Sequence, residues 1–258
     1  MELSYVAEGQ GPVVVLLHGF PLDQTMWQPL RAILGSNHRV VTPDLRGIGA
    51  TGAPEGDYSV DGMADDVVEL LDKLGLDQPI VLGGLSMGGY VVLSIALRFP
   101  ERLKGLVLLN SRAAADTPSA ARLRRTTADQ IEASGDPLPF LDGMVSRLFA
   151  PATLIEHPEL VEHWRSKMAG IPARTIVATL RGLADRPDRT NDLLKIRLPT
   201  LVLAGSDDQV VPLDESRSIV QLLPLGDLAV ISRAGHLTPV ENPGETAEAV
   251  QDFLDRIG

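Results

Sequence analysis

The chain of 258 residues contains no cysteine. This absence excludes disulfide bonds, thiolate chemistry and cysteine-ligated zinc. Basic residues are also few: 23 Lys and Arg stand against 34 Asp and Glu, which gives a net charge of −11. Nucleic acids require a basic binding surface, so we expect no nucleic-acid partner, and binding to an anionic membrane surface is disfavoured for the same reason.

Membrane-spanning runs and targeting signals are missing as well. The apolar run Val13–Leu17 is far shorter than the roughly 20 residues that a transmembrane helix needs. The N-terminal residues lack the basic region and the small-residue cleavage site of a signal peptide. We therefore expect a cytoplasmic protein with no membrane partner.

The first part of the chain alternates between strand-like and helix-like segments. Its length and its 44% of hydrophobic residues suit one α/β domain with a large buried core and an insertion. The predicted strands are Val13–Leu17, Arg39–Thr42, Ile80–Leu82 and Leu103–Asn110, and the predicted helices are Met26–Leu34, Val60–Leu74 and Met87–Phe99. This order predicts an α/β fold with a doubly wound, mostly parallel sheet.

The alternation is interrupted over residues 113–195, which contain no clear buried strand. Helical stretches are predicted there at Ala120–Glu132, Leu138–Phe149, Pro158–Lys167 and Thr175–Gly182. The alternation then resumes with Thr200–Ala204, Asp214–Leu222, Leu228–Ile231 and Pro243–Ile257. We therefore predict a core domain formed by residues 1–112 and 196–258, with a helical insertion of residues 113–195 between two strands.

Gly84-Leu85-Ser86-Met87-Gly88 matches the pattern G-x-S-x-G. The pattern alone is weak, but a buried strand stopped by Gly83-Gly84 precedes it and an apolar helix follows it. A sharp strand-to-helix turn of this kind holds a serine in a strained, accessible position, and glycines are needed where backbone segments crowd it. Ser86 is therefore a candidate nucleophile. The alternative is a glycine-rich helix start whose serine is only a cap.

A serine hydroxyl needs a base, and His236 is the best-placed histidine. It follows the last predicted strand, at the carboxyl edge of the sheet where ligands bind in this architecture. His38 opens a strand, and His157 and His163 lie in the insertion. The alternative interpretation of His236 is an ordinary loop histidine.

The base in turn needs a carboxylate to fix its tautomer. Asp207 and Asp208 both follow the strand Thr200–Ala204, and both are candidates. The resulting order along the chain, serine, then aspartate, then histidine, is the one expected for a G-x-S-x-G nucleophile on an α/β sheet.

An oxyanion hole requires two backbone donors. The N–H of Met87, directly after the candidate nucleophile, is the first. The second is the N–H of Phe20, in the segment His18-Gly19-Phe20-Pro21 that follows the strand Val13–Leu17. A plain Gly-Pro turn is the alternative for that segment.

Together these motifs resemble the α/β-hydrolase superfamily. The resemblance rests on His18-Gly19-Phe20-Pro21, Asp44-Leu45-Arg46-Gly47, Gly84–Gly89, Gly205-x-x-Asp208 and Gly235-His236. It is greatest to small bacterial carboxylesterases, to 3-oxoadipate enol-lactonases and to cofactor-free haloperoxidases (perhydrolases).

The resemblance implies roles for individual residues. Ser86 would be the nucleophile, His236 the base and Asp208 the acid, because the family's acid lies three residues after a glycine and four before a proline. Phe20 and Met87 would supply the oxyanion N–H groups, and residues 113–195 would form a cap over the site. Some members carry the acid after an earlier strand, but Asn110-Ser111 offers no carboxylate there.

The expected activity is hydrolysis of small carboxylic esters, with no metal or organic cofactor implied. A lactonase or a perhydrolase on the same residues is the nearest alternative, and a hydrolase-fold small-molecule receptor with little turnover is the alternative from another class. Trp27 and Trp164 are candidates for lining the substrate pocket, although burial alone explains an aromatic equally well. The substrate is a small ester or lactone, and the sequence leaves the oligomeric state open.

Three further patterns favour structural interpretations. Gly47–Gly52 matches G-x-G-x-x-G, but loop residues follow it where a dinucleotide site requires a helix. Glu159 and His163 lie one helical turn apart, which is more typical of a solvated face than of a metal site. Arg122, Arg124 and Arg125 form a basic patch that is better explained as a solvated helix face than as a site for an anionic substrate.

Overall fold

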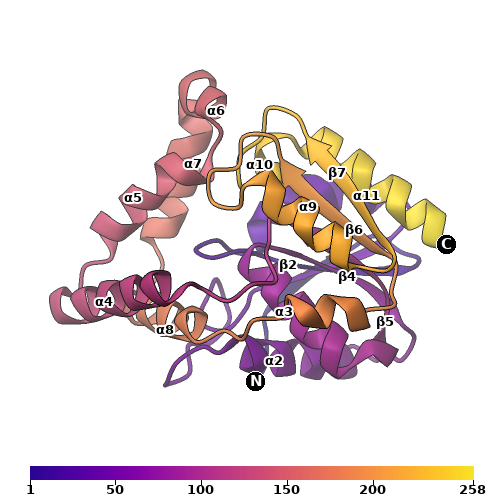
Figure 1. Cartoon of the computed structure of the whole chain (residues 1–258), viewed down its shortest axis with the longest axis horizontal. Helices are drawn as coiled ribbons and strands as arrows, with labels where there is room; N and C mark the ends of the chain where they lie inside the picture. Colours follow the sequence, from indigo (N-terminus) through magenta and orange to yellow (C-terminus); the bar gives the residue numbers. More distant parts are fainter.

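A seven-stranded sheet forms the centre of the molecule (Figure 1), in a computed structural model that describes all 258 residues. The strand order is β1-β3-β2-β4-β5-β6-β7, and only β1 runs antiparallel to its neighbour. The strands are β1 (Tyr5–Glu8), β2 (Val13–Leu17), β3 (Arg39–Pro43), β4 (Ile80–Leu85), β5 (Leu103–Leu109), β6 (Thr200–Gly205) and β7 (Gly226–Ile231). The predicted mostly parallel sheet is confirmed.

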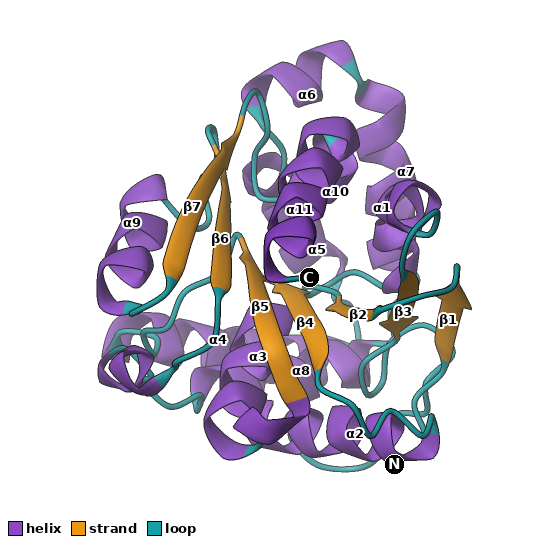
Figure 2. Cartoon of the chain, turned by 90° about the vertical axis from the view of Figure 1, so that its right-hand side faces the viewer, coloured by secondary structure: helices purple, strands orange, loops and turns teal.

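Helices cover both faces of this sheet (Figure 2). One face carries α1 (Gln28–Leu34) and α11 (Pro243–Ile257), which contact each other. The other face carries α2 (Val60–Lys73), α3 (Met87–Arg98) and α9 (Leu213–Leu222). The central strands are therefore buried on both sides, which explains why β2, β4 and β5 are almost continuously apolar in sequence.

Strand β4 is longer than the sequence indicated, and the prediction that Gly83-Gly84 stop it was wrong. Both glycines remain in the strand and pair with Leu16 and Leu17 of β2. Their lack of a side chain serves packing instead. A Cβ on Gly83 would lie 2.7 Å from Leu16 Cδ2, and a Cβ on Gly84 would collide with the backbone of Gly88.

Several short elements were not expected. β1 is a mostly exposed edge strand, so it lacks the apolar pattern that marks the other strands. A 3-10 helix, Gln24–Trp27, precedes α1 where one continuous helix was predicted, and the proline at the start of α1 suits this division. The four-residue helix α10 (Thr238–Glu241) follows β7 and carries no periodicity long enough to detect.

Five helices lie between β5 and β6 and stand to one side of the sheet, at the left in Figure 1. They are α4 (Pro118–Ser134), α5 (Leu138–Leu148), α6 (Pro151–Glu156), α7 (Pro158–Ala169) and α8 (Ala173–Ala184). α4 packs along α8, while α7 contacts both α5 and α6. No helix in the chain combines the length and the apolar character needed to cross a membrane.

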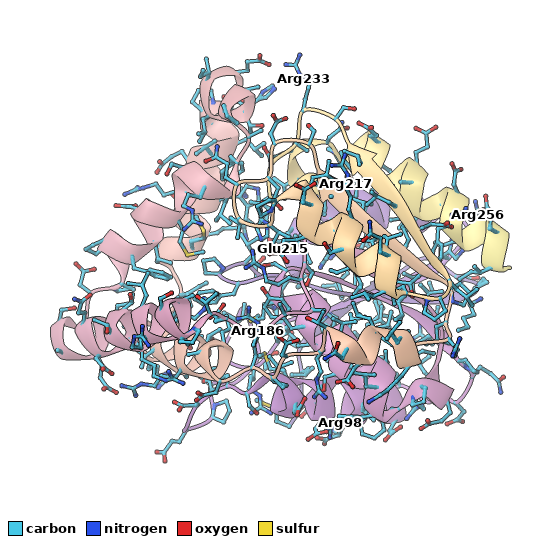
Figure 3. All side chains as sticks on the ribbon, viewed as in Figure 1. Arg98, Arg186, Glu215, Arg217, Arg233 and Arg256 are labelled. Atoms are coloured by element: carbon cyan, nitrogen blue, oxygen red, sulfur yellow. The ribbon has the colours of Figure 1, made fainter.

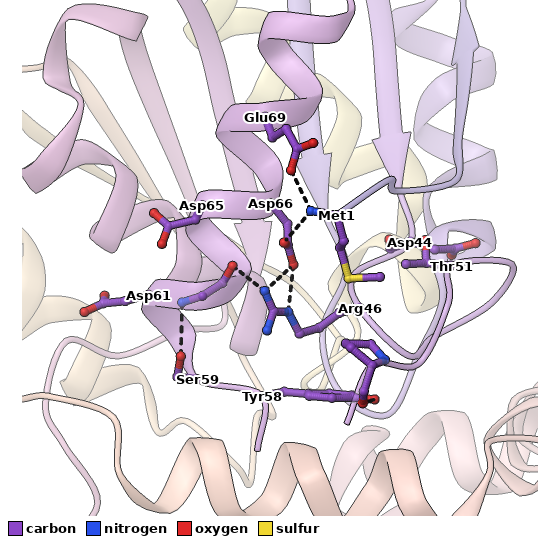
Figure 4. Close-up of polar contacts among 12 residues, drawn as sticks. Met1, Asp44, Arg46, Thr51, Tyr58, Ser59, Asp61, Asp65, Asp66 and Glu69 are labelled. Atoms are coloured by element: carbon purple, nitrogen blue, oxygen red, sulfur yellow. Dashed lines mark hydrogen bonds and ion pairs between the residues drawn. The ribbon is translucent and has the colours of Figure 1, made fainter. Parts of the chain in front are cut away.

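The segment Gly47–Gly52 is part of a loop, and the residue before it contacts α2 (Figure 4). Arg46, which precedes it, forms an ion pair with Asp66 and donates a hydrogen bond to the carbonyl of Gly62, both in α2. The next helix begins only at Val60. The segment therefore lacks the helix N-terminus on which a dinucleotide-binding motif depends.

Candidate active site

Ser86 occupies the turn between β4 and α3 with φ 52° and ψ −111°, a strained conformation for a residue other than glycine. Its backbone is held on both sides: its N–H donates to Leu109 O over 2.9 Å, and Ser111 Oγ donates to its carbonyl over 2.8 Å. A Cβ on Gly88 would collide with Leu17 O. Tight packing therefore fixes the Ser86 backbone, while its hydroxyl forms no hydrogen bond and borders a cavity.

His236 lies at the wall of the same cavity. Its Nδ1 lies 2.9 Å from Asp208 Oδ2, and both side chains are buried. An ionised Asp208 accepts this bond, so the ring proton is assigned to Nδ1 and the unprotonated Nε2 is left without a partner in the chain. No hydrogen bond joins Nε2 to Ser86 Oγ, and such bonds commonly tighten when a substrate binds.

Asp208, and not Asp207, reaches His236. Oδ1 of Asp208 accepts from the N–H groups of Val210 (2.7 Å) and Val211 (2.9 Å). Burial alone would raise the pKa of Asp208, but His236 and these hydrogen bonds outweigh burial and lower it. Asp207 is exposed and accepts a hydrogen bond only from Ser206.

Asn110 completes this network, and the sequence analysis missed it. Its Nδ2 donates to Asp208 Oδ2 over 2.9 Å, and its Oδ1 accepts from Thr238 over 2.8 Å. Its backbone has φ 47°, so it is a second strained residue at the site. A polar residue directly after a buried strand was the available signal, but it was judged only for its lack of a carboxylate.

Glu241 fixes the loop that carries His236. Its Oε1 accepts from the N–H groups of Gly235 (2.9 Å) and Leu237 (3.2 Å), on either side of the histidine. Its Oε2 accepts from the N–H of Ala150 and from Thr153 Oγ1, both over 2.7 Å. Glu241 therefore joins the His236 loop to the start of α6, and nothing in the sequence indicated this.

We expect Glu241→Gln to lower the free energy of unfolding by about 2–4 kcal/mol, because one pair of donors would face an amide NH₂ instead of an oxygen. A loosened His236 loop should also lower kcat by about 10- to 100-fold with a smaller change in KM. Urea denaturation and steady-state kinetics measure both. The matched control is Glu245→Gln, because Glu245 contacts Ser232 and Asn242 and no neighbour of His236. Equal effects of the two substitutions would contradict a positioning role for Glu241.

The segment His18–Pro21 follows β2, as predicted, and His18 holds it in place. The imidazole is fully buried. Its Nε2 accepts from the Leu45 N–H over 2.9 Å, so Nδ1 carries the proton and donates to Gly19 O over 3.0 Å. The N–H of Phe20 has no acceptor in the chain, and the N–H of Met87 lies at the free start of α3. Both N–H groups suit the binding of an anion.

Stability should depend on the protonation of His18. Burial lowers the pKa of His18 below 6.5, so the folded state favours the neutral ring. The contribution of the neutral His18 ring to the free energy of unfolding is complete above pH 6.5. It is lost as the pH falls from 6.5 toward the folded-state pKa, because the unfolded chain takes up a proton there first. The slope is at most about 1.4 kcal/mol per pH unit. Urea midpoints measured from pH 8 to 5 should decline less steeply in His18→Gln than in the wild type. Parallel curves for His18→Gln and the wild type would contradict this prediction. His38→Gln is a positive control: burial also lowers the pKa of His38, so this variant should show a less steep decline as well.

The cavity has a volume of about 520 Å³ and lies between the sheet and helices α4, α5 and α8. Phe20, Tyr90 and Phe140 give it aromatic walls. The two tryptophans lie elsewhere: Trp27 is fully buried in the core, and Trp164 is buried in α7. Neither lines this cavity, and burial in the core or in α7 accounts for both.

Comparison with known proteins finds similarity over the whole chain. A family model described as the alpha/beta hydrolase fold matches residues 12–243. 3-Oxoadipate enol-lactonase 2 of Acinetobacter baylyi is 28% identical, covering 100% of this chain and 94% of the relative. 2-Hydroxy-6-oxo-2,4-heptadienoate hydrolase of Pseudomonas putida is 32% identical, covering 95% and 90%. The structure of a thermophilic esterase from Thermogutta terrifontis, with malate bound, matches with a TM-score of 0.96 at 39% identity, covering 99% and 93%.

Proposed function

Since the chain belongs to the α/β-hydrolase fold family, we propose that it is a serine hydrolase that cleaves carboxylic esters of small substrates. The observation that carries the proposal is a single cavity containing both the strained Ser86 and His236, whose other ring nitrogen is bonded to Asp208. Burial of the acid and the base favours this role, because a water-excluded site strengthens the electrostatic interactions on which the chemistry depends.

In the first half-reaction, Ser86 Oγ attacks the ester carbonyl as His236 Nε2 takes its proton. The Asp208 carboxylate stabilises the imidazolium that forms. The N–H groups of Phe20 and Met87 donate to the oxyanion. His236 then returns the proton to the departing alkoxide, which leaves an acyl group on Ser86.

In the second half-reaction, His236 removes a proton from water, and the resulting hydroxide attacks the acyl carbonyl. The tetrahedral intermediate collapses, Ser86 leaves as its alkoxide and regains the proton from His236, and the carboxylic acid is released. We also propose that α4–α8 serve as the cap of the site, above a core formed by residues 1–112 and 196–258. Support comes from the cavity, to whose lining α4, α5 and α8 all contribute.

The test is turnover of p-nitrophenyl acetate by the purified protein, followed for many equivalents. Continuous release of p-nitrophenol supports an esterase, whereas release that stops after one equivalent supports a receptor that is acylated and stalls. A panel of esters with increasing acyl length defines the preferred substrate.

A lactonase is the second candidate, because an enol-lactonase from Acinetobacter baylyi matches the chain over its full length. Lactones belong in the same panel, with peracid formation from acetate and hydrogen peroxide assayed alongside. A kcat/KM for lactones well above that for every open-chain ester would replace the esterase proposal with the lactonase.

A further inference from the structure

The cavity next to Ser86 carries an excess of positive charge. Its walls include Arg112, Arg124 and Arg147 but only one carboxylate, that of Asp116. The whole chain has a net charge of −11, so this region opposes the overall charge. Partly apolar walls concentrate such a field and raise the local concentration of anions.

Most arginines of this protein are neutralised by a carboxylate. Those labelled in Figure 3 that form ion pairs with Asp or Glu are Arg98, Arg186, Arg217, Arg233 and Arg256. Arg124 also pairs, with Asp116. Arg112 and Arg147 form no ion pair, so two of the three arginines that line the cavity of Ser86 lack a carboxylate partner.

Arg112 is held beside the candidate catalytic residues with hydrogen-bonding capacity to spare. It follows Ser111, whose hydroxyl donates to the Ser86 carbonyl. Its Nη2 donates to Val210 O over 2.6 Å, in the loop that binds Asp208, while its buried Nε has no partner. A partly buried guanidinium that is not fully hydrogen-bonded gains from an anionic acceptor.

Arg147 also lines this cavity. It occupies the last turn of α5, directly before Leu148, whose carbonyl accepts from the His236 N–H over 2.9 Å. Its side chain is exposed and free of hydrogen bonds to the chain. Arg112 is therefore one residue from a contact of Ser86, and Arg147 is one residue from a contact of His236.

We infer that Arg112 and Arg147 bind a carboxylate carried by the substrate, so that the preferred substrates are anionic esters or lactones. The inference rests on the proposed hydrolysis at Ser86 and specifies its substrate class. The two guanidinium groups would hold the carboxylate while the scissile carbonyl lies at Ser86. Arg122 and Arg125 do not line the cavity, so the basic patch predicted from sequence contributes only Arg124, which Asp116 already neutralises.

The test compares 4-nitrophenyl hydrogen adipate with 4-nitrophenyl methyl adipate, which differ in whether the far end of the acyl chain is a carboxylate or a methyl ester. The wild type should favour the anionic ester by about 10- to 100-fold in kcat/KM, chiefly through KM, as expected for charge-assisted hydrogen bonds. In the double variant Arg112→Gln/Arg147→Gln this ratio should fall to about 1. Arg112→Lys should keep part of the preference, because it retains the charge but loses the planar fork.

Arg122→Gln is the matched control, since Arg122 is exposed, forms no ion pair and lies outside the cavity; it should leave the ratio unchanged. A wild-type ratio near 1, or a preference that persists in the double variant, overturns the anion site while the hydrolase stands. If neither ester is turned over, the hydrolase proposal fails, and calorimetric titration with adipate decides the anion site alone. Binding that the double variant loses supports the site, and an absence of binding to the wild type overturns it.

Discussion

Ser86→Ala is expected to lower kcat for a p-nitrophenyl ester by about 10⁶-fold, the size of effect seen when a serine nucleophile is removed from a comparable set of residues. The fold should survive. Ser86 Oγ forms no hydrogen bond within the chain, so its removal leaves no buried partner unsatisfied. Far-UV circular dichroism and the thermal midpoint should therefore match those of the wild type, while nitrophenol release falls to the background rate.

The control for this prediction lies on the same helix. Ser94 is buried in α3, and its hydroxyl donates to Asp61 over 2.6 Å, away from the cavity. Ser94→Ala should lose some stability and keep its activity, which is the reverse of the expectation for Ser86→Ala. Full turnover in Ser86→Ala would show that this serine is not the nucleophile.

The parts of the fold that were predictable are those with strong local signals. β2, β4 and β5 are apolar runs because helices cover both of their faces, and such runs are visible without a structure. β1 was missed because an exposed edge strand has no buried face to leave a pattern. Gly83 and Gly84 were misjudged because glycine breaks strands on average, whereas here close contacts with β2 and α3 require it.

The residues of the candidate site also separate into those with a local sequence signal and those without one. Ser86, His236 and Asp208 lie in motifs with fixed spacing, since each depends on a local turn at the end of a strand. Asn110 and Glu241 act through partners that are 98 and 91 residues away in sequence, Asp208 and Ala150, and such pairings leave no local pattern. The positions of Trp27 and Trp164 outside the cavity were not predictable, because an aromatic in the core and one in a pocket wall leave the same pattern in the sequence.

Asp208→Asn is expected to lower kcat by about 10⁴-fold, because it should reverse the tautomer of His236. The asparagine oxygen would keep the two N–H donors of Val210 and Val211, which places the amide NH₂ against the ring. His236 must then present an unprotonated Nδ1 and carry its proton on Nε2, where it cannot accept one from Ser86.

The same substitution should also lower stability by about 1–3 kcal/mol, because the Asn110 amide would lose its acceptor and face another donor. A flip of Asn110 cannot restore the bond without breaking its contacts with Thr238 and Gly235. Activity measured at temperatures well below the thermal midpoint of the variant separates the catalytic loss from unfolding.

Asp207→Asn provides a matched control at the adjacent position, with the same change of charge. Asp207 is exposed and its side chain bonds only to Ser206, so its variant should retain nearly the wild-type kcat and thermal midpoint. Steady-state kinetics on the pair therefore test the geometry directly, because the two variants share composition and net charge and differ only in which side chain reaches His236. Inactivation by Asp207→Asn with activity kept in Asp208→Asn would reverse the assignment of the acid.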